Sequence, residues 1–371
     1  GVSFIPAAQQ SNKLQWMVSH GVNLVLGTNG DEWTVSGGTD QGPITPTSVS
    51  IQRRSGYGSQ FIPALLIGET IAFVQRGGRK VRSVAPRQEG LVWAAADMTV
   101  LAEHVARVGI VQTAVMHFPQ TILWAVTGDG RLLGMTFEQE QNVFAWHVHE
   151  TDGAVESVGV VFGAESDEVW LAVRRNGKRL IERLDPRVMA LTFSDQSKLI
   201  FLDCSKRVEL ATASATITGL AHLEGREVTV LGDGAEMPTA RVVGGSITLE
   251  RAVRVAVVGL PFTSELQPMR VDIPMADGTS QHRQWRTSRV GLYLHESLGG
   301  EVADAPGARF EKLNYRDAGT LTDAPPPLFT GEKETAIESN ARPGVDVMIR
   351  TSGPFPLNIG SLTLKGDIYG E

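Results

Sequence analysis

The chain has 371 residues, of which 42% are hydrophobic, and its 34 Lys and Arg against 41 Asp and Glu give a formal net charge of −7 at pH 7. The apolar content excludes a disordered chain, and the acidic balance disfavours stable binding of nucleic acid, because that affinity comes mainly from Lys and Arg that displace phosphate counterions. The single cysteine, Cys204, excludes an internal disulfide bond and a cysteine-rich metal site.

The first residues show no targeting signal. The sequence begins at Gly1 without a basic segment followed by an apolar core, so we expect no signal peptide and a chain excised from a longer protein. Even the apolar run from Ala252 to Phe262 is interrupted by Arg254 and is shorter than the about 20 residues that a membrane-spanning helix needs. We therefore expect a soluble protein with no membrane partner.

A hairpin with a glycine turn recurs through the first half of the chain. In each copy an apolar run enters a two-residue turn and leaves through a more polar, alternating run. The four copies span residues 24–33, 71–81, 123–133 and 170–180, and their turn glycines are Gly30, Gly78, Gly130 and Gly177. The spacings are 48 (30 to 78), 52 (78 to 130) and 47 (130 to 177) residues, close to the period of β-propeller blades.

These repeats predict a propeller-like region over residues 1–212. It would contain about four to five hairpin units, with a fifth, partial unit beginning at Leu199. An ordinary antiparallel sandwich with evenly spaced hairpins is the alternative interpretation. One inserted helix is expected near 97–108, because Asp97 is a good N-cap and apolar residues follow at helical spacing. Those residues are Met98, Leu101, Val105 and Val108.

Beyond residue 212 the pattern changes. Residues 213–262 carry short alternating runs and a turn at Gly234, which predicts a small β-barrel-like module. Residues 263–371 contain further alternating runs and predict a β-sandwich-like domain. Within it, the polar run from Gly331 to Asn340 is predicted to belong to a long loop. The predicted fold class is therefore mainly β.

His147 and His149 are the best candidates for metal ligands. Alternate residues of a strand point to one face, so the two imidazoles could share an ion. The sequence shows no third ligand for them. The competing interpretation directs Trp146 and Val148 toward the core and both histidines toward solvent or a neighbouring strand. We favour this second interpretation and predict that no metal is bound.

The sequence contains no recognisable catalytic signature. It has no phosphate-binding loop, no dinucleotide fingerprint and no nucleophile elbow. The adjacent carboxylates Asp31 and Glu32, like Asp167 and Glu168, would point to opposite faces of a strand, so neither pair could flank one glycosidic bond. We therefore predict no catalytic residue, no cofactor and no enzymatic activity.

Several segments resemble consecutive parts of a phage tail protein family. They are Gly27–Trp33, Pro63–Leu65 with Phe73–Arg76, Asp97–His104, Leu123–Val126 with Asp129–Gly130, Val143–His149, and Leu223–Val228 with Asp233–Gly234. The resemblance is to the tail nozzle, or tail tubular protein B, of short-tailed bacteriophages and prophages. It spans nearly the whole chain, but its shared positions are turns and core residues rather than catalytic groups.

The resemblance implies a structural component of the virion that is made in the cytoplasm of the bacterial host. In that family a propeller is combined with a β-rich platform, several subunits form a ring, and the genome leaves through the central channel. The implied partners are further copies of the same chain, other tail or portal-adaptor proteins, and DNA that passes through without stable binding.

Two other classes of protein stay open. A propeller glycosidase would show repeated Ser-x-Asp-x-Gly-x-x-Trp boxes, and only residues 28–33 give a faint match. A carbohydrate- or protein-binding propeller would need exposed aromatic platforms, whereas the 7 Trp and 4 Tyr lie mostly within apolar runs.

Overall fold

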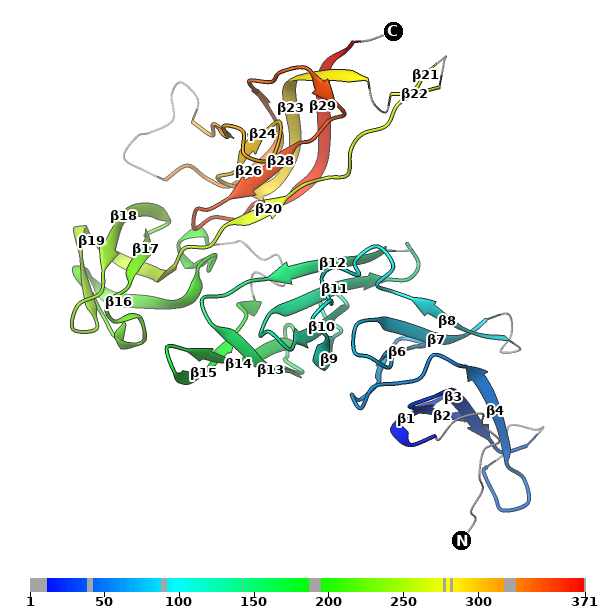
Figure 1. The fold of residues 1–371 in the computed structure, drawn as a ribbon. Helices are drawn as coiled ribbons and strands as arrows, with labels where there is room; N and C mark the ends of the chain where they lie inside the picture. The colour runs from blue at the N-terminus through cyan, green and yellow to red at the C-terminus, as the bar shows by residue number, and fades with distance from the viewer. Residues whose placement is uncertain are drawn as a thin grey trace. The chain divides into compact units, whose positions relative to one another are not determined.

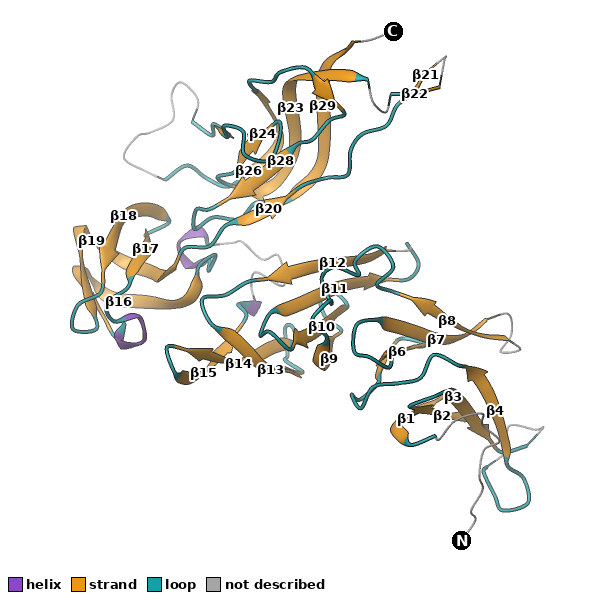
Figure 2. Cartoon of the chain, viewed as in Figure 1, coloured by secondary structure: helices purple, strands orange, loops and turns teal. Residues whose placement is uncertain are grey.

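The computed structural model describes residues 12–38, 43–87, 92–141, 143–186, 195–275, 278–280, 283–316 and 325–369 (Figures 1 and 2). The chain divides into two compact units, residues 1–190 and 191–371. Most of the described residues form short antiparallel sheets joined by turns. The predicted fold class is confirmed: propeller-like repeats are followed by a small barrel-like module and a sandwich-like domain.

The first unit consists of four successive meandering sheets, which we call blades 1 to 4, and Figure 1 shows them in order from blue to green. Blade 1 contains β1 (Leu14–His20), β2 (Asn23–Thr28), β3 (Glu32–Ser36) and β4 (Ser50–Ser55). Blade 2 contains β5 (Leu65–Ile67), β6 (Thr70–Val74), β7 (Val81–Arg87) and β8 (Val92–Asp97). Blade 3 contains β9 (Ile110–Met116), β10 (Ile122–Thr127), β11 (Leu132–Glu138) and β12 (Val143–His149). Blade 4 has three strands, β13 (Ala154–Val161), β14 (Glu168–Arg175) and β15 (Lys178–Arg183).

Each blade buries one face against the next blade. Trp16 and Val25 of blade 1 pack with Phe73 of blade 2 in one apolar cluster. A second cluster joins blades 2 and 3, and a third joins blades 3 and 4. Strand β10 serves both of the latter clusters, because Leu123 faces blade 2 whereas Trp124 faces blade 4. A central strand that is covered on both faces is apolar along its whole length, which explains the uninterrupted apolar runs of the repeats.

The segment between β8 and β9 is not the predicted helix. It forms a series of turns from Met98 to Val108. The carboxylate of Asp97 accepts hydrogen bonds from the backbone N and the Oγ1 of Thr99, at 2.9 and 2.7 Å, and so fixes the first turn. Met98 and Val105 are buried as expected, but Leu101 is 90% exposed and Val108 54%. The buried face is completed by the small side chains of Ala102 and Ala106, which the helical pattern did not include.

The second unit begins with the small module. Its sheet has the order β16-β19-β17-β18, with β16 (Asp203–Thr218), β17 (Glu227–Gly232), β18 (Ala235–Arg241) and β19 (Ser246–Leu260). Two short 3-10 helices, η1 (Gln196–Lys198) and η2 (Ala221–Leu223), accompany it. The predicted boundary between residues 212 and 213 falls inside β16, because this long strand pairs along β19 over most of its length. The predicted fifth blade at Leu199 is also corrected, since Leu202 packs with Leu231 and Val257 of this module.

The sandwich-like domain packs two main sheets around one core. One sheet contains β20 (Ser264–Leu266), β28 (Met348–Thr351), β24 (Glu301–Ala303) and β25 (Glu311–Lys312). The other contains β23 (Gln284–Ser297), β26 (Phe329–Ala336), β27 (Arg342–Pro343) and β29 (Ile359–Tyr369), and β21 (Pro274–Met275) pairs separately with β22 (Gly278–Thr279). Val290 and Leu292 of β23 meet Val302 and Ile349 of the facing sheet. Strand β26 occupies much of the run predicted as a loop. Among the described residues no helix is long and apolar enough to span a membrane.

Candidate functional site

The turn glycines lie where the repeats place them, at the tips of hairpins. Gly78, Gly130, Gly177 and Gly234 have φ of 76, 86, 77 and 80°, a left-handed conformation that favours glycine. Gly30 is not among the positive-φ residues, and its turn is closed by Thr28, whose backbone N donates to the Asp31 carbonyl at 2.9 Å. These positions shape the hairpins and carry no reactive group.

The structure brings His147 and His149 into direct contact. Their rings lie 4.8 Å apart, and Nδ1 of His147 is 2.7 Å from Nε2 of His149, so one nitrogen donates a proton to the other. Both rings pack on Trp124, at centroid distances of 5.9 and 5.2 Å. The ring of His147 lies over Gly134, where an added Cβ would come within 2.0 Å of Cε1.

The environment of this pair disfavours protonation of both rings. Burial lowers the pKa of His147, and burial together with the neighbouring imidazole lowers the pKa of His149 to about 4. In the part of the chain that the structure describes, no group of three or more His, Cys, Asp or Glu side chains could hold a metal ion. Trp146 does turn toward the core of blades 2 and 3, as predicted, and its Nε1 donates to the Met98 carbonyl at 2.8 Å. Val148, expected to be buried, is 39% exposed.

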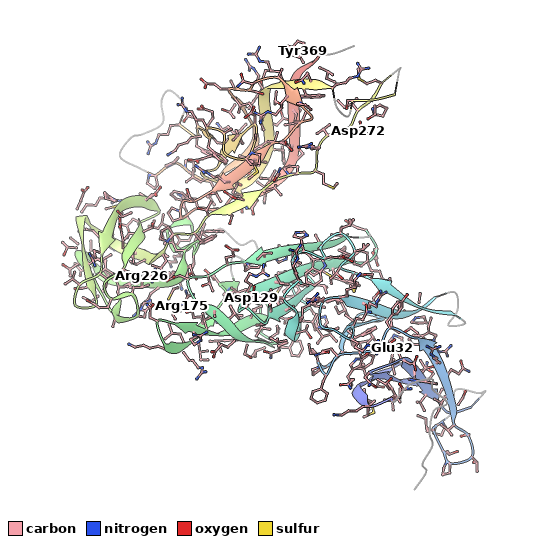
Figure 3. The ribbon with its side chains drawn as sticks, viewed as in Figure 1. Glu32, Asp129, Arg175, Arg226, Asp272 and Tyr369 are labelled. Carbon is pink, nitrogen blue, oxygen red and sulfur yellow. The ribbon has the colours of Figure 1, made fainter. Side chains whose placement is uncertain are left out.

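Glu32 is a fully buried carboxyl group at the start of β3 (Figure 3). It accepts hydrogen bonds from Ser55 Oγ at 2.5 Å and Ser59 Oγ at 3.0 Å. Burial raises its pKa, and these hydrogen bonds oppose the rise. Its neighbour Asp31 forms an ion pair with Arg53 at 2.5 Å. Glu32 therefore holds the loop that joins β4 to blade 2, Asp31 holds β4 itself, and the side chain of Glu32 is enclosed by protein.

The second pair of adjacent carboxylates is also structural. Asp167 is buried, and its Oδ2 accepts hydrogen bonds from the backbone N of His117 at 2.8 Å and of Phe118 at 3.2 Å. Glu168 forms an ion pair with Arg183 at 2.5 Å. Asp167 thus ties the β9–β10 turn to blade 4, while Glu168 lies on the opposite face of β14.

A cleft, which is a concave surface with converging polar groups, lies in the second unit. It has a volume of about 670 Å³ and lies between β18 and β19 of the small module and the loops of the sandwich. Its charged and aromatic lining residues include Glu236, Arg251, Glu301, Lys312, Tyr315 and Arg316. A Gly299–Gly300 turn, with φ of 92 and 96°, forms part of its wall.

Neighbouring contacts fix the wall of this cleft. The hydroxyl of Tyr315 donates to the Gly299 carbonyl at 2.6 Å, and burial raises the pKa of this phenol to about 12. The side chain of Gln196 donates to the carbonyl oxygens of Gly234 and Pro326, at 3.0 and 3.1 Å, and so joins the β17–β18 turn to the proline run. No predicted site included the residues of this cleft. Its local signals were the paired glycines and the polar, aromatic run from 312 to 316.

Comparisons with known proteins give only a distant likeness. No family model matches the chain, and no curated protein matches it. Among solved structures, an exo-β-1,3-galactanase from Phanerochaete chrysosporium in complex with β-1,3-galactotriose is 9% identical, with a TM-score of 0.29 over 96% of this chain and 82% of that chain. A sialidase from Trypanosoma rangeli in complex with sialic acid is 10% identical, with a TM-score of 0.25 over 98% of this chain and 82% of that chain.

These neighbours contradict one expectation from the sequence. We predicted that the chain has no enzymatic activity, whereas the similar structures are an exo-galactanase and a sialidase. The expectation of a non-enzymatic protein is therefore corrected. At these TM-scores the likeness assigns no substrate and no residue role to this chain.

Proposed function

We propose that this propeller-like protein is a structural subunit of the tail of a short-tailed phage or prophage and works within a larger assembly. The observation that supports the proposal is the outer face of blade 4. Val169, Leu171 and Val173 of β14 face blade 3, so the alternate residues of the same strand point the other way. The last blade of the row thus presents a second sheet face.

The side chains of this outer face are of the kinds found in interfaces. We define it by Val161, Trp170, Ile181 and Arg183, which the register of β13, β14 and β15 places on one side. Val161 is 55% exposed and Ile181 71%. The guanidinium of Arg183 lies 5.4 Å from the Trp170 ring, and Trp170 Nε1 donates to Glu168 at 3.0 Å. Aromatic and arginine side chains beside exposed aliphatic ones are typical of interface centres.

Labelling this protein in intact virions tests the assignment. We expect the label at the tail, and its absence from purified particles would contradict the proposal. A finer test uses Ile181→Glu, which places a charge at the centre of the outer face and should reduce the assembled fraction in light scattering. Leu101→Glu is the matched control, because Leu101 is 90% exposed on the turns between β8 and β9. Equal effects of the two variants would argue against an interface on blade 4.

A second candidate function is carbohydrate binding, and the cleft of the second unit favours it. Saccharide sites combine hydrogen-bonding side chains with an aromatic surface, and the cleft offers Glu236, Asn314, Arg316 and the half-buried ring of Tyr315. A glycan array tests this candidate directly. An assay of glycoside cleavage on the same preparation separates a propeller glycosidase from a binding module.

A further inference from the structure

Among the described residues that line the cleft, cations outnumber carboxylates. Arg251, Lys312 and Arg316 are cationic, and Glu236 and Glu301 are the acidic lining residues. Glu301 is already matched by Arg350, whose NH2 lies 2.8 Å from its carboxylate and whose guanidinium packs on the Phe310 ring at 3.6 Å. Arg251 and Lys312 therefore share the cleft with one described carboxylate, that of Glu236, which Arg350 does not neutralise.

Two of these cations keep donors for a ligand. Arg251 donates from NH2 to the Gly232 carbonyl at 3.1 Å, and a guanidinium has four further N–H groups. Lys312 is 84% exposed, and its ion pair with Glu301 has a long N–O distance of 3.9 Å. A guanidinium and an ammonium in one cleft favour an anionic group with several oxygen atoms.

An aromatic wall stands beside these cations. The Tyr315 ring is held at one end by the hydrogen bond to Gly299 and at its edge by Phe329, whose centroid is 6.0 Å away. The ring is half-buried, so part of it faces the cleft. A fixed ring offers an apolar surface at little cost in side-chain entropy, which suits the C–H face of a sugar.

We propose that this cleft binds an acidic saccharide, with the anionic group held by Arg251 and Lys312 and a sugar ring against Tyr315. The inference rests on the second candidate function, carbohydrate binding, and adds the ligand class. A volume of about 670 Å³ lies within the usual range for small-molecule sites. The anionic group can be a uronate carboxylate or a sugar phosphate, since both present the same oxygen-rich charge to the cations.

Calorimetric titration with matched saccharides tests the proposal. The protein is titrated with an oligosaccharide that contains uronic acid, with a sugar phosphate, and with the neutral analogue of each. We expect an acidic ligand to bind at least about tenfold more tightly than its neutral analogue, and the affinity to fall as salt is raised from about 50 to 300 mM. The acidic ligand that binds shows whether the anionic group is a uronate carboxylate or a sugar phosphate.

Single substitutions assign the contacts. Arg251→Gln and Lys312→Gln should each weaken the acidic ligand several-fold and leave any neutral ligand unchanged. The matched control is Lys178→Gln, an exposed lysine in the hairpin of blade 4, which should bind like the parent protein. Lys312 is so exposed that its substitution does not threaten folding, so the test holds even if Arg251→Gln is unstable.

The outcomes separate this inference from the function on which it rests. Binding of neutral saccharides alone, or equal binding of acidic and neutral ones, overturns the inference but leaves carbohydrate binding standing. Binding of no saccharide at all overturns both. Tight binding of an acidic saccharide that survives both cleft substitutions places the site elsewhere and also rejects the inference.

Discussion

His147 and His149 make blade 3 sensitive to acid. Burial lowers both pKa values in the folded state, that of His149 to about 4. The unfolded chain therefore binds protons more readily, so this contribution to stability is complete above about pH 6.5 and is lost as the pH falls toward 4. Because His149 is an exposed residue, water screens much of the effect, and we expect a loss of about 1 kcal/mol.

Thermal unfolding measured from pH 7 to pH 4 checks this expectation. The double variant His147→Gln/His149→Gln should have a flatter pH profile than the parent protein. His104→Gln is the control, because His104 is exposed on the turns before β9. Parallel profiles for the parent and the double variant would show that the imidazole pair does not titrate with folding.

Glu32 tests the cost of a buried carboxyl group. Burial raises the pKa of Glu32 in the folded state. The neutral carboxyl group therefore contributes to the free energy of unfolding at low pH, and this contribution is lost as the pH rises above the ordinary glutamate pKa of 4.5. Glu32→Ala should cost about 2–4 kcal/mol, because it leaves a cavity and strips a partner from the buried Ser59 hydroxyl. Glu32→Gln keeps the volume and cannot ionise, so at pH 7 it should cost about 1 kcal/mol or less. Urea unfolding of the two variants measures the difference, and equal losses would contradict this account.

At the scale of single strands, glycine has two separate uses in the blades. Gly27 of β2 lies beneath Trp16, and an added Cβ would come within 2.0 Å of the ring. Gly177 has φ of +77° but open space around its Cβ position. Gly27→Ala should therefore cost about 3 kcal/mol through displacement of a buried Trp, and Gly177→Ala about 1 kcal/mol through backbone strain alone. Denaturant unfolding gives both values, and only Gly27→Ala should change the tryptophan fluorescence of the folded protein.

Local signals were enough to predict the hairpins, because each turn glycine and each apolar central strand acts within about ten residues. Local signals failed to predict the structure where contacts between residues far apart in the sequence determine it. Strand β26 is polar, yet Glu334 pairs with Arg289 of β23 and Lys365 of β29, at 2.9 and 2.6 Å, so charges from two other strands stabilise it. The turns after Asp97 likewise follow the shape of the core between blades 2 and 3. The cleft of the second unit draws its residues from positions between 235 and 355, which no local pattern could connect.

For the molecule as a whole, the affinity for nucleic acid depends on how many of its arginines and lysines are already paired with acidic side chains. The densest basic segment lies in the hairpin of β14 and β15, and its arginines are paired. Arg174 and Arg179 share Glu156, at 3.1 and 2.6 Å, and Arg175 pairs with Glu182 at 2.7 Å. The hydrogen bond from Arg179 is the main reason that the pKa of Glu156 is lowered, so this carboxylate stays charged to a lower pH than an ordinary glutamate.

We therefore expect weak, non-specific DNA binding, with Kd of about 10⁻⁴ to 10⁻⁶ M at about 150 mM salt. Glu156→Gln removes the carboxylate that Arg174 and Arg179 share. It should strengthen DNA binding several-fold at about 50 mM salt. The slope of the logarithm of the affinity against the logarithm of the salt concentration should become steeper by the equivalent of up to about two phosphate contacts. Glu227→Gln is the matched control. It changes the net charge equally, but Glu227 lies on β17, outside the basic hairpin of β14 and β15, and accepts a hydrogen bond from the hydroxyl of Thr239. Fluorescence anisotropy with labelled duplex DNA measures both variants. Submicromolar binding by the parent protein would overturn the expectation, and equal gains for the two variants would show that net charge alone, rather than the pairing of these arginines, controls the affinity.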